Sequence, residues 1–590
     1  MRFTLALTVA AAVANAASLT DVCTPANVKA SLPSDGSILG LTIDPVSLTV
    51  NTVMNASTSG QNMYPDAVFS FCNITFAYTH NGRNDQVLLN YWLPAPANFQ
   101  NRYLSTGGGG LAINSGLTTS GSLPGGVQYG AVSGLTDGGF GGFTKQFDSV
   151  FLLANGTVNW EETFMFGYQA HHELNLIGKA FTKQFFNLNS TKLYSYYQGC
   201  SEGGREGWSQ VQRFAGEFDG VITGAPAFRY AFQQTQHLYS NVVEQTLGYY
   251  PSPCEFDKIT NETIAACDPL DGKTDGVVAR TDLCKLHFNA SSIIGKPYYC
   301  AASSGGGGPP GRKRQFPGGG ASTPTQNGTV TAQGVAVANK IIDGLVDSEG
   351  KRVYLSYQPA AASFADATTA YNAATQSWEL SVTGLGAEWV TRFLDLQNTS
   401  SISSANFANV TYDTLKNWMI QGLNFYQDTL HTAWPDLTPF QQGGGKVLHF
   451  HGESDDSIPP ASSVRYHESV RKIMYPHMAY NASQEAIGQW YRLFLVPGAQ
   501  HCAPGTLQPN GAFPQTNLAV MINWVEKGVV PTTLNATVLR GANKGDKSQI
   551  CAWPLRPFWP SNNATMQCVY DQSSIDNWNY DFDGVKVPVY

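Results

Sequence analysis

The sequence GCSEGG (residues 199–204) decides the fold, because it sets a serine in a glycine-rich turn that matches the pattern G-x-S-x-G. Residues 192–200, which are rich in tyrosine, predict a strand, and residues 202–214 predict a helix. Glycines permit the tight, strained turn that exposes the hydroxyl of Ser201 where the helix begins. A glycine-rich turn without chemistry follows the same pattern, and the neighbouring Cys200 is a rival nucleophile. The rest of the chain has to decide between these alternatives.

Strands and helices alternate on both sides of this turn. Before it, the pattern predicts strands at 87–94, 102–110 and 149–155 and a long helix at 160–186. After it, the pattern predicts strands at 220–226, 446–452 and 491–498 and helices at 461–474 and 517–527. This order predicts an α/β fold with a mainly parallel sheet covered by helices.

The alternation stops between residues 230 and 430, which hold cysteines, Asp-Gly turns and helix-like segments. Within this stretch, residues 303–329 are rich in Gly, Pro and Ser and predict an exposed, mobile loop. We interpret the chain as one α/β core, residues 18–229 and 431–590, with an inserted lid, residues 230–430. Two independent domains in tandem fit the pattern less well, because the βαβ order resumes after the insertion.

The N-terminus predicts a secreted protein, and the net charge bears on the partners that it can bind. Arg2, an apolar stretch and the small-residue run at 14–16 have the layout of a secretory signal peptide, residues 1–17. We see no later run of 18 apolar residues, so we expect no membrane anchor after signal cleavage. The formal net charge of −8 gives no reason to expect a nucleic-acid partner.

Cysteines and glycosylation sequons also indicate export. The ten cysteines form no CxxC pair, so five disulfides are expected in an oxidising compartment, and zinc is a poor alternative. N-glycosylation sequons are spread over the whole chain, at Asn55, Asn73, Asn155, Asn189, Asn261, Asn289, Asn327, Asn398, Asn409, Asn481, Asn535 and Asn563.

Two polar residues follow the later predicted strands. Asp455 comes just after the strand at 446–452, and His501 just after the strand at 491–498. In the α/β-hydrolase fold, the nucleophile, the acid and the histidine follow in this order on loops after strands. The order predicts a Ser201–Asp455–His501 triad. Asp456 is a rival for the acid, and a structural role is the alternative for His451.

The cysteines beside this triad decide between serine and thiol. Cys200 precedes Ser201, and Cys502 follows His501. If these two cysteines form a disulfide, their Cα atoms lie roughly 5.5 Å apart, and Ser201 and His501 come within side-chain reach. A thiol mechanism requires a free Cys200, which the even cysteine count disfavours. We therefore predict Ser201 as the nucleophile and Cys200 as part of a disulfide that holds nucleophile and base together.

An oxyanion hole is predicted from the sequence STGGGGL (residues 105–111). This glycine run follows an early strand, as the oxyanion loop of esterases does. A backbone N–H from the run Gly107 to Gly110, with Gly108 and Gly109 as the chosen candidates, would join that of Glu202 in stabilising a tetrahedral oxyanion. The alternative is a flexible glycine loop without a catalytic role.

These residues together resemble the tannase and feruloyl esterase family of fungal secreted hydrolases. The resemblance rests on GCSEGGREG, DGVITGAPAFR, CDPLDGKTDGVV, HGESDDSIPP and PGAQHC and covers the chain from about residue 21 to residue 590. It implies an α/β-hydrolase core with a lid and an esterase for polyphenol esters, first of all galloyl esters. Feruloyl esters are the alternative substrates, and a non-catalytic glycoprotein that binds polyphenol or glycan is an alternative of another class. Glu202 stands where the family leads us to expect aspartate.

The resemblance also implies a structural calcium ion in the lid. The sequence CDPLDGKTDGVV carries three carboxylates within eight residues, although their spacing is not that of an EF-hand and turn formation explains Asp-Gly pairs equally well. The implied ligands are Asp268, Asp271, Asp275 and the carbonyls of Lys273 and Val277. No catalytic cofactor is expected, since a serine triad needs none.

The remaining expectations concern cross-links and processing. The other disulfides are predicted to be Cys23–Cys72, Cys254–Cys300, Cys267–Cys284 and Cys551–Cys568. In the loop at 303–329, Lys313 and Arg314 form a dibasic site that a kexin-type protease reads, with an uncut basic loop as the alternative. Cleavage would give two chains joined by a disulfide, and a higher oligomer is left open.

Overall fold

The computed structural model describes residues 17–116, 122–303, 323–361, 364, 366–562 and 564–590. The first sixteen residues of the predicted signal peptide, the Lys313–Arg314 site and Asn563 lie outside these ranges. No helix in the described part of the chain is long and apolar enough to cross a membrane.

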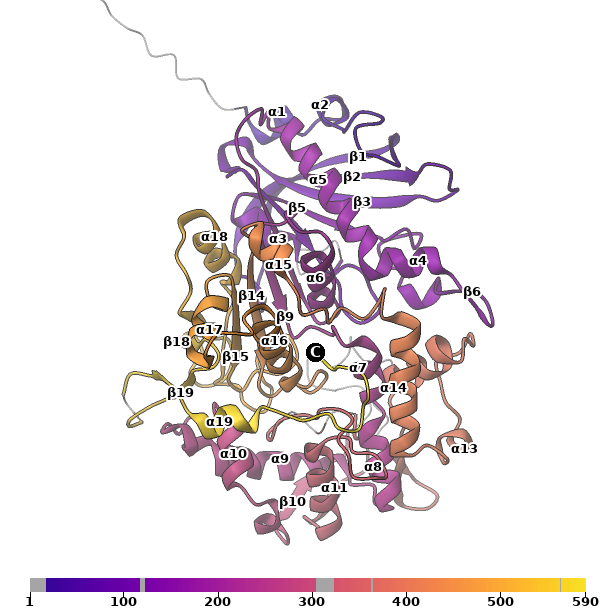
Figure 1. Cartoon of the computed structure of the whole chain (residues 1–590), viewed down its shortest axis with the longest axis vertical. Helices are drawn as coiled ribbons and strands as arrows, with labels where there is room; N and C mark the ends of the chain where they lie inside the picture. Colours follow the sequence, from indigo (N-terminus) through magenta and orange to yellow (C-terminus); the bar gives the residue numbers. More distant parts are fainter. Residues whose placement is uncertain (1–16, 117–121, 304–322, 362–363, 365, 563) are drawn as a thin grey trace, which may run out of the picture.

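One nine-stranded sheet runs through the molecule in the order β1-β2-β3-β5-β4-β8-β9-β14-β15 (Figure 1). Its strands are β1 (Leu41–Ser57), β2 (Val68–His80), β3 (Val87–Pro94), β4 (Arg102–Thr106), β5 (Ala131–Thr136), β8 (Tyr194–Cys200), β9 (Gly220–Gly224), β14 (Lys446–Gly452) and β15 (Tyr491–Val496). Neighbouring strands from β5 to β15 are parallel, whereas β1, β2, β3 and β5 pair antiparallel. The sheet is therefore mixed, and it is mainly parallel as predicted, because only the pairs among β1, β2, β3 and β5 are antiparallel.

The prediction of a core strand at 149–155 is wrong, because these residues do not belong to this sheet. Only Leu152–Ala154 is extended there, as β6, and it pairs with β7 (Thr157–Val158) in a small separate hairpin. The strand next to β4 is β5 instead. The long helix predicted at 160–186 is present as α4 (Trp160–Phe164), a π-helical turn at Met165–Gln169, and α5 (Ala170–Phe185).

Both faces of the parallel strands are buried, which explains their almost continuous apolar sequences. Tyr196, Ile222 and Leu448 share one cluster with Met521 and Trp524 of α18 (Asn517–Lys527). The residues next to them in the strands point to the other face and pack with α6 (Glu202–Arg213) and α16 (Ala461–Met474); they are Tyr197, Val221 and Val447. The turn after β8 is thus held between two packed layers.

The stretch between β9 and β14 adds helices and two small hairpins, and none of its described residues joins the central sheet. Its longer helices gather at one end of the molecule, in the lower half of Figure 1; they are α7 (Tyr230–Gln236), α8 (Tyr239–Leu247), α9 (Pro253–Cys267), α11 (Ala332–Asp343) and α14 (Tyr412–Tyr426). The hairpins are β10 (Pro297–Cys300) with β11 (Gln326–Thr329), and β12 (Thr369–Asn372) with β13 (Ser377–Leu380). The name lid for residues 230–430 remains an interpretation of this arrangement.

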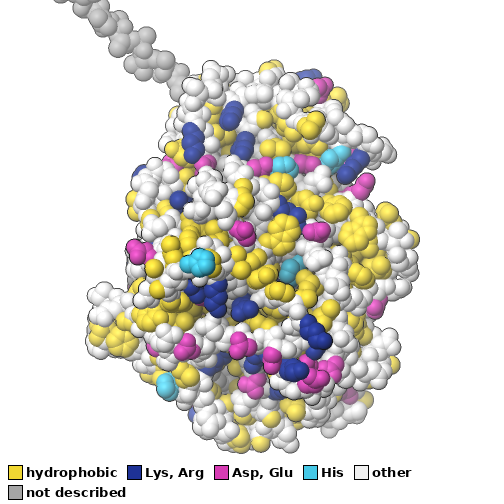
Figure 2. Space-filling view, viewed as in Figure 1, with side chains coloured by type: hydrophobic (Ala, Val, Ile, Leu, Met, Phe, Trp, Pro, Cys, Tyr) yellow, Lys and Arg dark blue, Asp and Glu magenta, His cyan; other side chains and the backbone are white. Residues whose placement is uncertain are grey.

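Charged side chains of both signs are interspersed with apolar ones on the face shown in Figure 2. With the formal net charge of −8, this face offers no broad basic surface of the kind that binds a phosphate backbone.

Candidate active site

Ser201 stands in a strained turn between β8 and α6. Its backbone has φ 67° and ψ −123°, which is rare for a residue with a side chain. The glycines around it are required by close packing: a Cβ on Gly199 would lie 2.4 Å from the carbonyl oxygen of Gly203, and one on Gly204 would lie 2.5 Å from that of Gly224. The strand, turn and helix predicted from the sequence are all present, and they hold the Ser201 hydroxyl at the N-terminus of α6.

His501 and Asp455 line up behind this hydroxyl. The Oγ of Ser201 lies 2.8 Å from Nε2 of His501, and Nδ1 of His501 lies 2.8 Å from Oδ2 of Asp455. The carboxylate places the imidazole proton on Nδ1, so Nε2 accepts the hydrogen bond from Ser201. The structure therefore brings together the three residues predicted from the sequence, in the geometry that activates a serine.

Electrostatics at the site favour this arrangement. Burial alone would raise the pKa of Asp455, but the adjacent His501 and a hydrogen bond from His451 hold it well below its usual range. The other carboxylate oxygen accepts hydrogen bonds of 2.8 Å from the backbone amides of Ser457 and Ile458. Burial lowers the pKa of His501, and the attraction of Asp455 outweighs burial, so the net pKa is raised. Asp455 stays ionised and stabilises the imidazolium that forms when His501 takes a proton.

His451 contributes a buried contact that the sequence left open. Its Nε2 lies 3.1 Å from Oδ2 of Asp455 and 3.0 Å from the carbonyl oxygen of Ile458. Its Nδ1 lies 2.6 Å from the hydroxyl of Ser463, which in turn lies 2.8 Å from Nε2 of His449. His449 and His451, which are two residues apart in β14, thus point to the same side of the sheet. Through these contacts they hold the carboxylate of Asp455 in place.

A disulfide joins the nucleophile turn to the histidine loop. Cys200 and Cys502 are bonded, with their Cα atoms 6.1 Å apart. Cys200 is therefore not available as a thiolate, and a thiol mechanism is excluded in this state. The other four predicted pairs are also present, namely Cys23–Cys72, Cys254–Cys300, Cys267–Cys284 and Cys551–Cys568.

The oxyanion assignment needs a correction at the glycine loop. The N–H of Gly108 donates to Oε2 of Glu206 at 2.9 Å, and the N–H of Gly109 donates to the carbonyl oxygen of Ala112 at 3.0 Å. Both groups are already engaged, so neither is free for an oxyanion. Glu202 begins α6, and its N–H has no acceptor within the helix. The N–H of Gly107 donates to the carbonyl oxygen of Gln198 at 3.2 Å. Gly110, which lines the same cavity as Ser201, is therefore the glycine of this run left as the candidate for a second donor.

The side chain of Glu202 has a structural partner beneath the turn. Arg205, which is fully buried, donates from Nε to Glu202 Oε1 at 2.7 Å. Its other nitrogens donate to the carbonyl oxygens of Gly167 and Phe166, which lie in the π-helical turn where the regular α-helical bonding is interrupted. Burial raises the pKa of Glu202 to about 7, although Arg205 opposes the rise. The backbone N–H of residue 202 does not belong to the side chain. Glutamate in place of aspartate therefore keeps this oxyanion donor at the start of α6.

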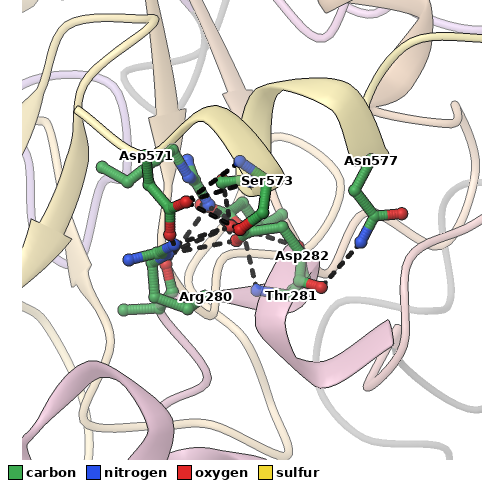
Figure 3. A network of polar contacts seen from close by, with 10 residues as sticks. Arg280, Thr281, Asp282, Asp571, Ser573 and Asn577 are labelled. Atoms are coloured by element: carbon green, nitrogen blue, oxygen red, sulfur yellow. Dashed lines mark hydrogen bonds and ion pairs between the residues drawn. The ribbon is translucent and has the colours of Figure 1, made fainter. Parts of the chain in front are cut away.

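A buried ion network anchors the loop that carries Asp455. Glu453 accepts hydrogen bonds from Arg556 at 2.7 Å and from Thr281 at 2.7 Å. Arg556 also contacts Asp282 at the start of α10 (Thr281–His287). Figure 3 shows the contacts of this region with α19 (Gln572–Asn577): Arg280 donates to Asp571 at 2.6 Å, and Asn577 donates to the carbonyl oxygen of Asp282 at 2.7 Å. Segments far apart in the sequence are thereby tied to the end of β14.

A cavity of about 360 Å³ opens beside Ser201. Its walls combine aromatic side chains from the inserted segment with polar side chains, among them Tyr230, Gln233, His237, Glu388, Trp389 and Phe393. Aromatic walls with a few fixed polar groups are typical of a site for a small ring-bearing molecule. No motif or periodicity indicates these residues, because they come together only in the folded chain.

The carboxylates predicted to hold calcium lie around one turn of the inserted segment. Asp268 accepts hydrogen bonds from the backbone amides of Asp275 and Gly276 at 3.1 and 2.9 Å, and Asp271 is buried. The oxygen donors suit calcium in type. Lys273 contacts Asp275 at 2.8 Å, and no group of three or more His, Cys, Asp or Glu side chains in the described residues is already drawn together for a metal ion. The calcium site therefore stays a prediction.

Ten of the sequon asparagines are exposed, as glycosylation requires: Asn55, Asn155, Asn189, Asn261, Asn289, Asn327, Asn398, Asn409, Asn481 and Asn535. Asn73 is only half exposed, and its side-chain oxygen accepts a hydrogen bond from Asn90 at 2.7 Å. The occupancy of these sites stays a prediction.

The fold and the site define an α/β-hydrolase of the esterase type. Residues 72–575 match the family model described as tannase and feruloyl esterase, and the chain belongs to this family. It is 52% identical to a tannase of Aspergillus oryzae over 99% of both chains, and 31% identical to a probable feruloyl esterase of Arthroderma benhamiae over 86% of this chain and 88% of the relative.

Solved structures agree with this placement. A tannin acyl hydrolase from Aspergillus niger is 60% identical and superposes with a TM-score of 0.92 over 97% of this chain and 99% of its own. A feruloyl esterase B from Aspergillus oryzae is 26% identical, with a TM-score of 0.65 over 92% of this chain and 100% of its own. The chain is therefore an enzyme of an esterase family, and both substrate classes occur among its relatives.

Proposed function

We propose that the protein is a secreted serine esterase that hydrolyses galloyl esters, both gallotannins and simple gallates, to gallic acid and an alcohol. The proposal rests on the hydrogen bonds that connect Ser201 to His501 and His501 to Asp455. Ser201 lies at the wall of a cavity of about 360 Å³, which has room for an aromatic ring. The two relatives of highest identity named above, a tannase and a tannin acyl hydrolase, support the galloyl acyl group. Disulfides and exposed sequons support export.

The mechanism follows from the geometry. Ser201 attacks the ester carbonyl while His501 takes the hydroxyl proton, and Asp455 stabilises the imidazolium. The N–H of Glu202 at the start of α6 stabilises the oxyanion. The tetrahedral intermediate collapses, the alcohol leaves with the proton from His501, and a galloyl ester of Ser201 remains. Water then attacks this acyl-enzyme, His501 takes a proton from the water, and gallic acid leaves as Ser201 regains its proton.

Initial rates on methyl gallate and methyl ferulate, measured side by side, test the proposed acyl preference. We expect a kcat/KM for methyl gallate at least tenfold above that for methyl ferulate. A clear preference for methyl ferulate would move the assignment to a feruloyl esterase, which the relatives at 26–31% identity make the second candidate. Turnover of neither ester would favour the non-catalytic binding protein.

We further propose that calcium is bound in the inserted segment by Asp268, Asp271 and Asp275 with the carbonyls of Lys273 and Val277. The ion would neutralise buried carboxylates and fix the turn, and we expect it to take no part in the reaction. A ligand that binds only the folded state stabilises it by mass action. We expect a chelator to lower the Tm by a few degrees, calcium but not magnesium to restore it, and Asp271→Asn to abolish the response. An unchanged Tm in the wild type would contradict the site.

We also propose cleavage after Arg314. A cut there would leave seven cysteines upstream and three downstream, and of the five disulfides present only Cys200–Cys502 joins the two sides. On a denaturing gel we expect one band without reductant and two glycosylated bands with it, whereas Lys313→Ala with Arg314→Ala should give one band in both. A single reduced band from the wild type would contradict the cleavage.

A further inference from the structure

A group of aromatic side chains lies on the surface, outside the cavity beside Ser201. We call it the aromatic strip, and its five members are Trp160, Phe164, Tyr168, Phe214 and Trp434. Three of them are 36–44% exposed and the other two are half-buried, and none of the five lines the cavity. Single exposed apolar side chains are normal on a protein surface, whereas a contiguous group of them marks an interaction site. The strip therefore calls for a ligand or a partner.

Most of the strip follows one side of a helix. Trp160, Phe164 and Tyr168 are four residues apart along α4 and the π-helical turn, and their neighbouring ring centroids are 6.3 and 6.1 Å apart. Side chains at this spacing lie next to each other on a helix. Phe214, directly after α6, continues the series with its ring centroid 6.1 Å from that of Tyr168. Figure 2 shows apolar side chains gathered on the middle of this face, where Figure 1 places α4 and α14.

Arg213 holds the last member of the strip in place. Trp434 lies in the segment between α14 and α15 (Thr438–Gln442), and its ring centroid is 4.7 Å from the guanidinium carbon of Arg213. The ring centroid of Tyr168 is 4.3 Å from the same carbon. Nη2 of Arg213 donates to the carbonyl oxygen of Asp428 at 2.6 Å. Rings that are fixed before binding lose little freedom when a ligand stacks on them, so the strip is preorganised.

Two further ring contacts connect the strip with the cavity. The ring centroids of Trp160 and Tyr426 are 6.2 Å apart, and those of Tyr426 and Trp389 are 5.5 Å apart. Trp389 lines the cavity beside Ser201. A single side chain, Tyr426, therefore lies between the first ring of the strip and the wall of the cavity. A large molecule that occupies the cavity can reach the strip at the same time.

The chemistry of the strip favours a flat, neutral ring as its ligand. Its five side chains carry no formal charge. A hydroxylated ring that stacks on them covers apolar surface while its hydroxyl groups stay in water, so no polar atom is buried without a partner. Five rings are also far fewer than the about 20 to 30 residues that each partner contributes to a stable protein interface. A small aromatic ligand therefore fits better than a second copy of the chain.

We propose that the aromatic strip binds galloyl rings of a gallotannin other than the ring whose ester is cleaved. This inference rests on the proposed function and adds a second binding site for the same class of substrate. A gallotannin carries several galloyl groups on one sugar. A ring bound on the strip would hold another ester of the same molecule near the cavity and raise its effective concentration at Ser201. Methyl gallate has a single ring and would gain nothing from the strip.

Initial rates of gallic acid release from pentagalloylglucose and from methyl gallate test the proposal. Trp160→Ala and Trp434→Ala should each lower kcat/KM for pentagalloylglucose by about 3- to 10-fold, the loss of one stacked ring. Both should leave kcat/KM for methyl gallate within about twofold of the wild type. Trp160→Phe keeps a ring and should recover most of the loss. Tyr299→Ala is the matched control and should change neither rate, because Tyr299 is 69% exposed in β10 and no ring contact in the described residues joins it to the strip.

Binding of pentagalloylglucose to the inactive Ser201→Ala protein, measured by calorimetry, gives the same comparison without turnover. Adding Trp160→Ala or Trp434→Ala to this protein should raise the Kd by about 3- to 10-fold. Thermal unfolding of each variant shows whether it is folded. If one of the two tryptophan variants fails to fold, the other carries the test.

The outcomes separate this inference from the proposed function. Release of gallic acid from neither ester by the wild type would overturn both. Release from methyl gallate, with the ratio of the two substrates unchanged in both tryptophan variants, would overturn the inference alone. The same selective loss in Tyr299→Ala would also overturn it, since the effect would then belong to any exposed ring. A wild-type dimer that becomes monomeric in the tryptophan variants, measured by sedimentation velocity, would show that the strip binds a second copy instead.

Discussion

Replacing Ser201 by alanine should lower kcat on methyl gallate by about 10⁵- to 10⁶-fold, as removal of a serine nucleophile does in comparable triads. The hydroxyl is the group that His501 deprotonates, at 2.8 Å, and alanine offers nothing to attack the carbonyl. Folding should be unaffected, because serine and alanine share the Cβ that experiences the strained φ of 67°. We expect secretion and the Tm to remain nearly those of the wild type.

Ser195→Ala is the matched control for this result. Ser195 lies in β8, the strand that leads to Ser201; it is buried, and its hydroxyl donates a hydrogen bond to the carbonyl oxygen of Glu217 at 2.6 Å. Its replacement should cost about 1 kcal/mol of stability and leave kcat within about twofold. Nearly full activity in Ser201→Ala, measured by initial rates together with thermal unfolding, would show that the nucleophile lies elsewhere.

The chemistry of the site was predictable because its signals are local. The turn at Ser201 depends on glycines within five residues, and Asp455 and His501 each follow a strongly apolar strand by a few residues. The parallel sheet then brings those loops to one edge, since the carboxyl ends of parallel strands meet there. The pairing of Cys200 with Cys502 followed from the same reasoning, because each cysteine is next to a member of the triad.

The oxyanion glycines were not predictable in the same way. Four consecutive glycines look alike in sequence, and which N–H is free depends on Glu206, one turn along the helix after the nucleophile. The arrangement of the cavity wall beside Ser201 depends on still more distant contacts, since Gln233 is oriented by Ser457 and by His237 with Asp366. Neither the sequence motifs nor the periodicity of apolar residues indicates such long-range contacts.

The N-terminal part of the sheet was predicted least well. β1 is long but half exposed, so it lacks the alternation of apolar residues that identifies a strand. β5 is short and leads into a glycine-rich turn, which hides it among loop signals. By contrast, β8, β9, β14 and β15 are buried on both faces and carry continuous apolar runs. The prediction therefore missed β1, β2 and β5, whereas it found β3 and the parallel strands β4, β8, β9, β14 and β15.

The choice of Asp455 over its neighbour Asp456 rests on the hydrogen bonds of a single carboxylate. Oδ1 of Asp455 accepts from two backbone amides, while Oδ2 faces His501 and His451. An asparagine here would keep its oxygen toward the backbone amides and turn its NH2 group toward Nδ1 of His501. The histidine would then accept at Nδ1 and carry its proton on Nε2, facing Ser201, where it cannot act as a base.

Asp455→Asn should therefore lower kcat on methyl gallate by about 10⁴-fold, the loss that a wrong histidine tautomer produces. Asp456→Asn is the matched control: Asp456 is half-buried and acts on His501 only through its charge, which favours the protonated imidazole. Its replacement should change kcat by less than about tenfold and move the acidic limb of the pH–rate profile toward lower pH, because the pKa of His501 falls when that charge is removed. Both variants keep the side-chain volume, so their Tm values report whether either loss comes from unfolding. If Asp456→Asn loses activity as severely as Asp455→Asn while both remain folded, the acid of the triad has been assigned to the wrong aspartate.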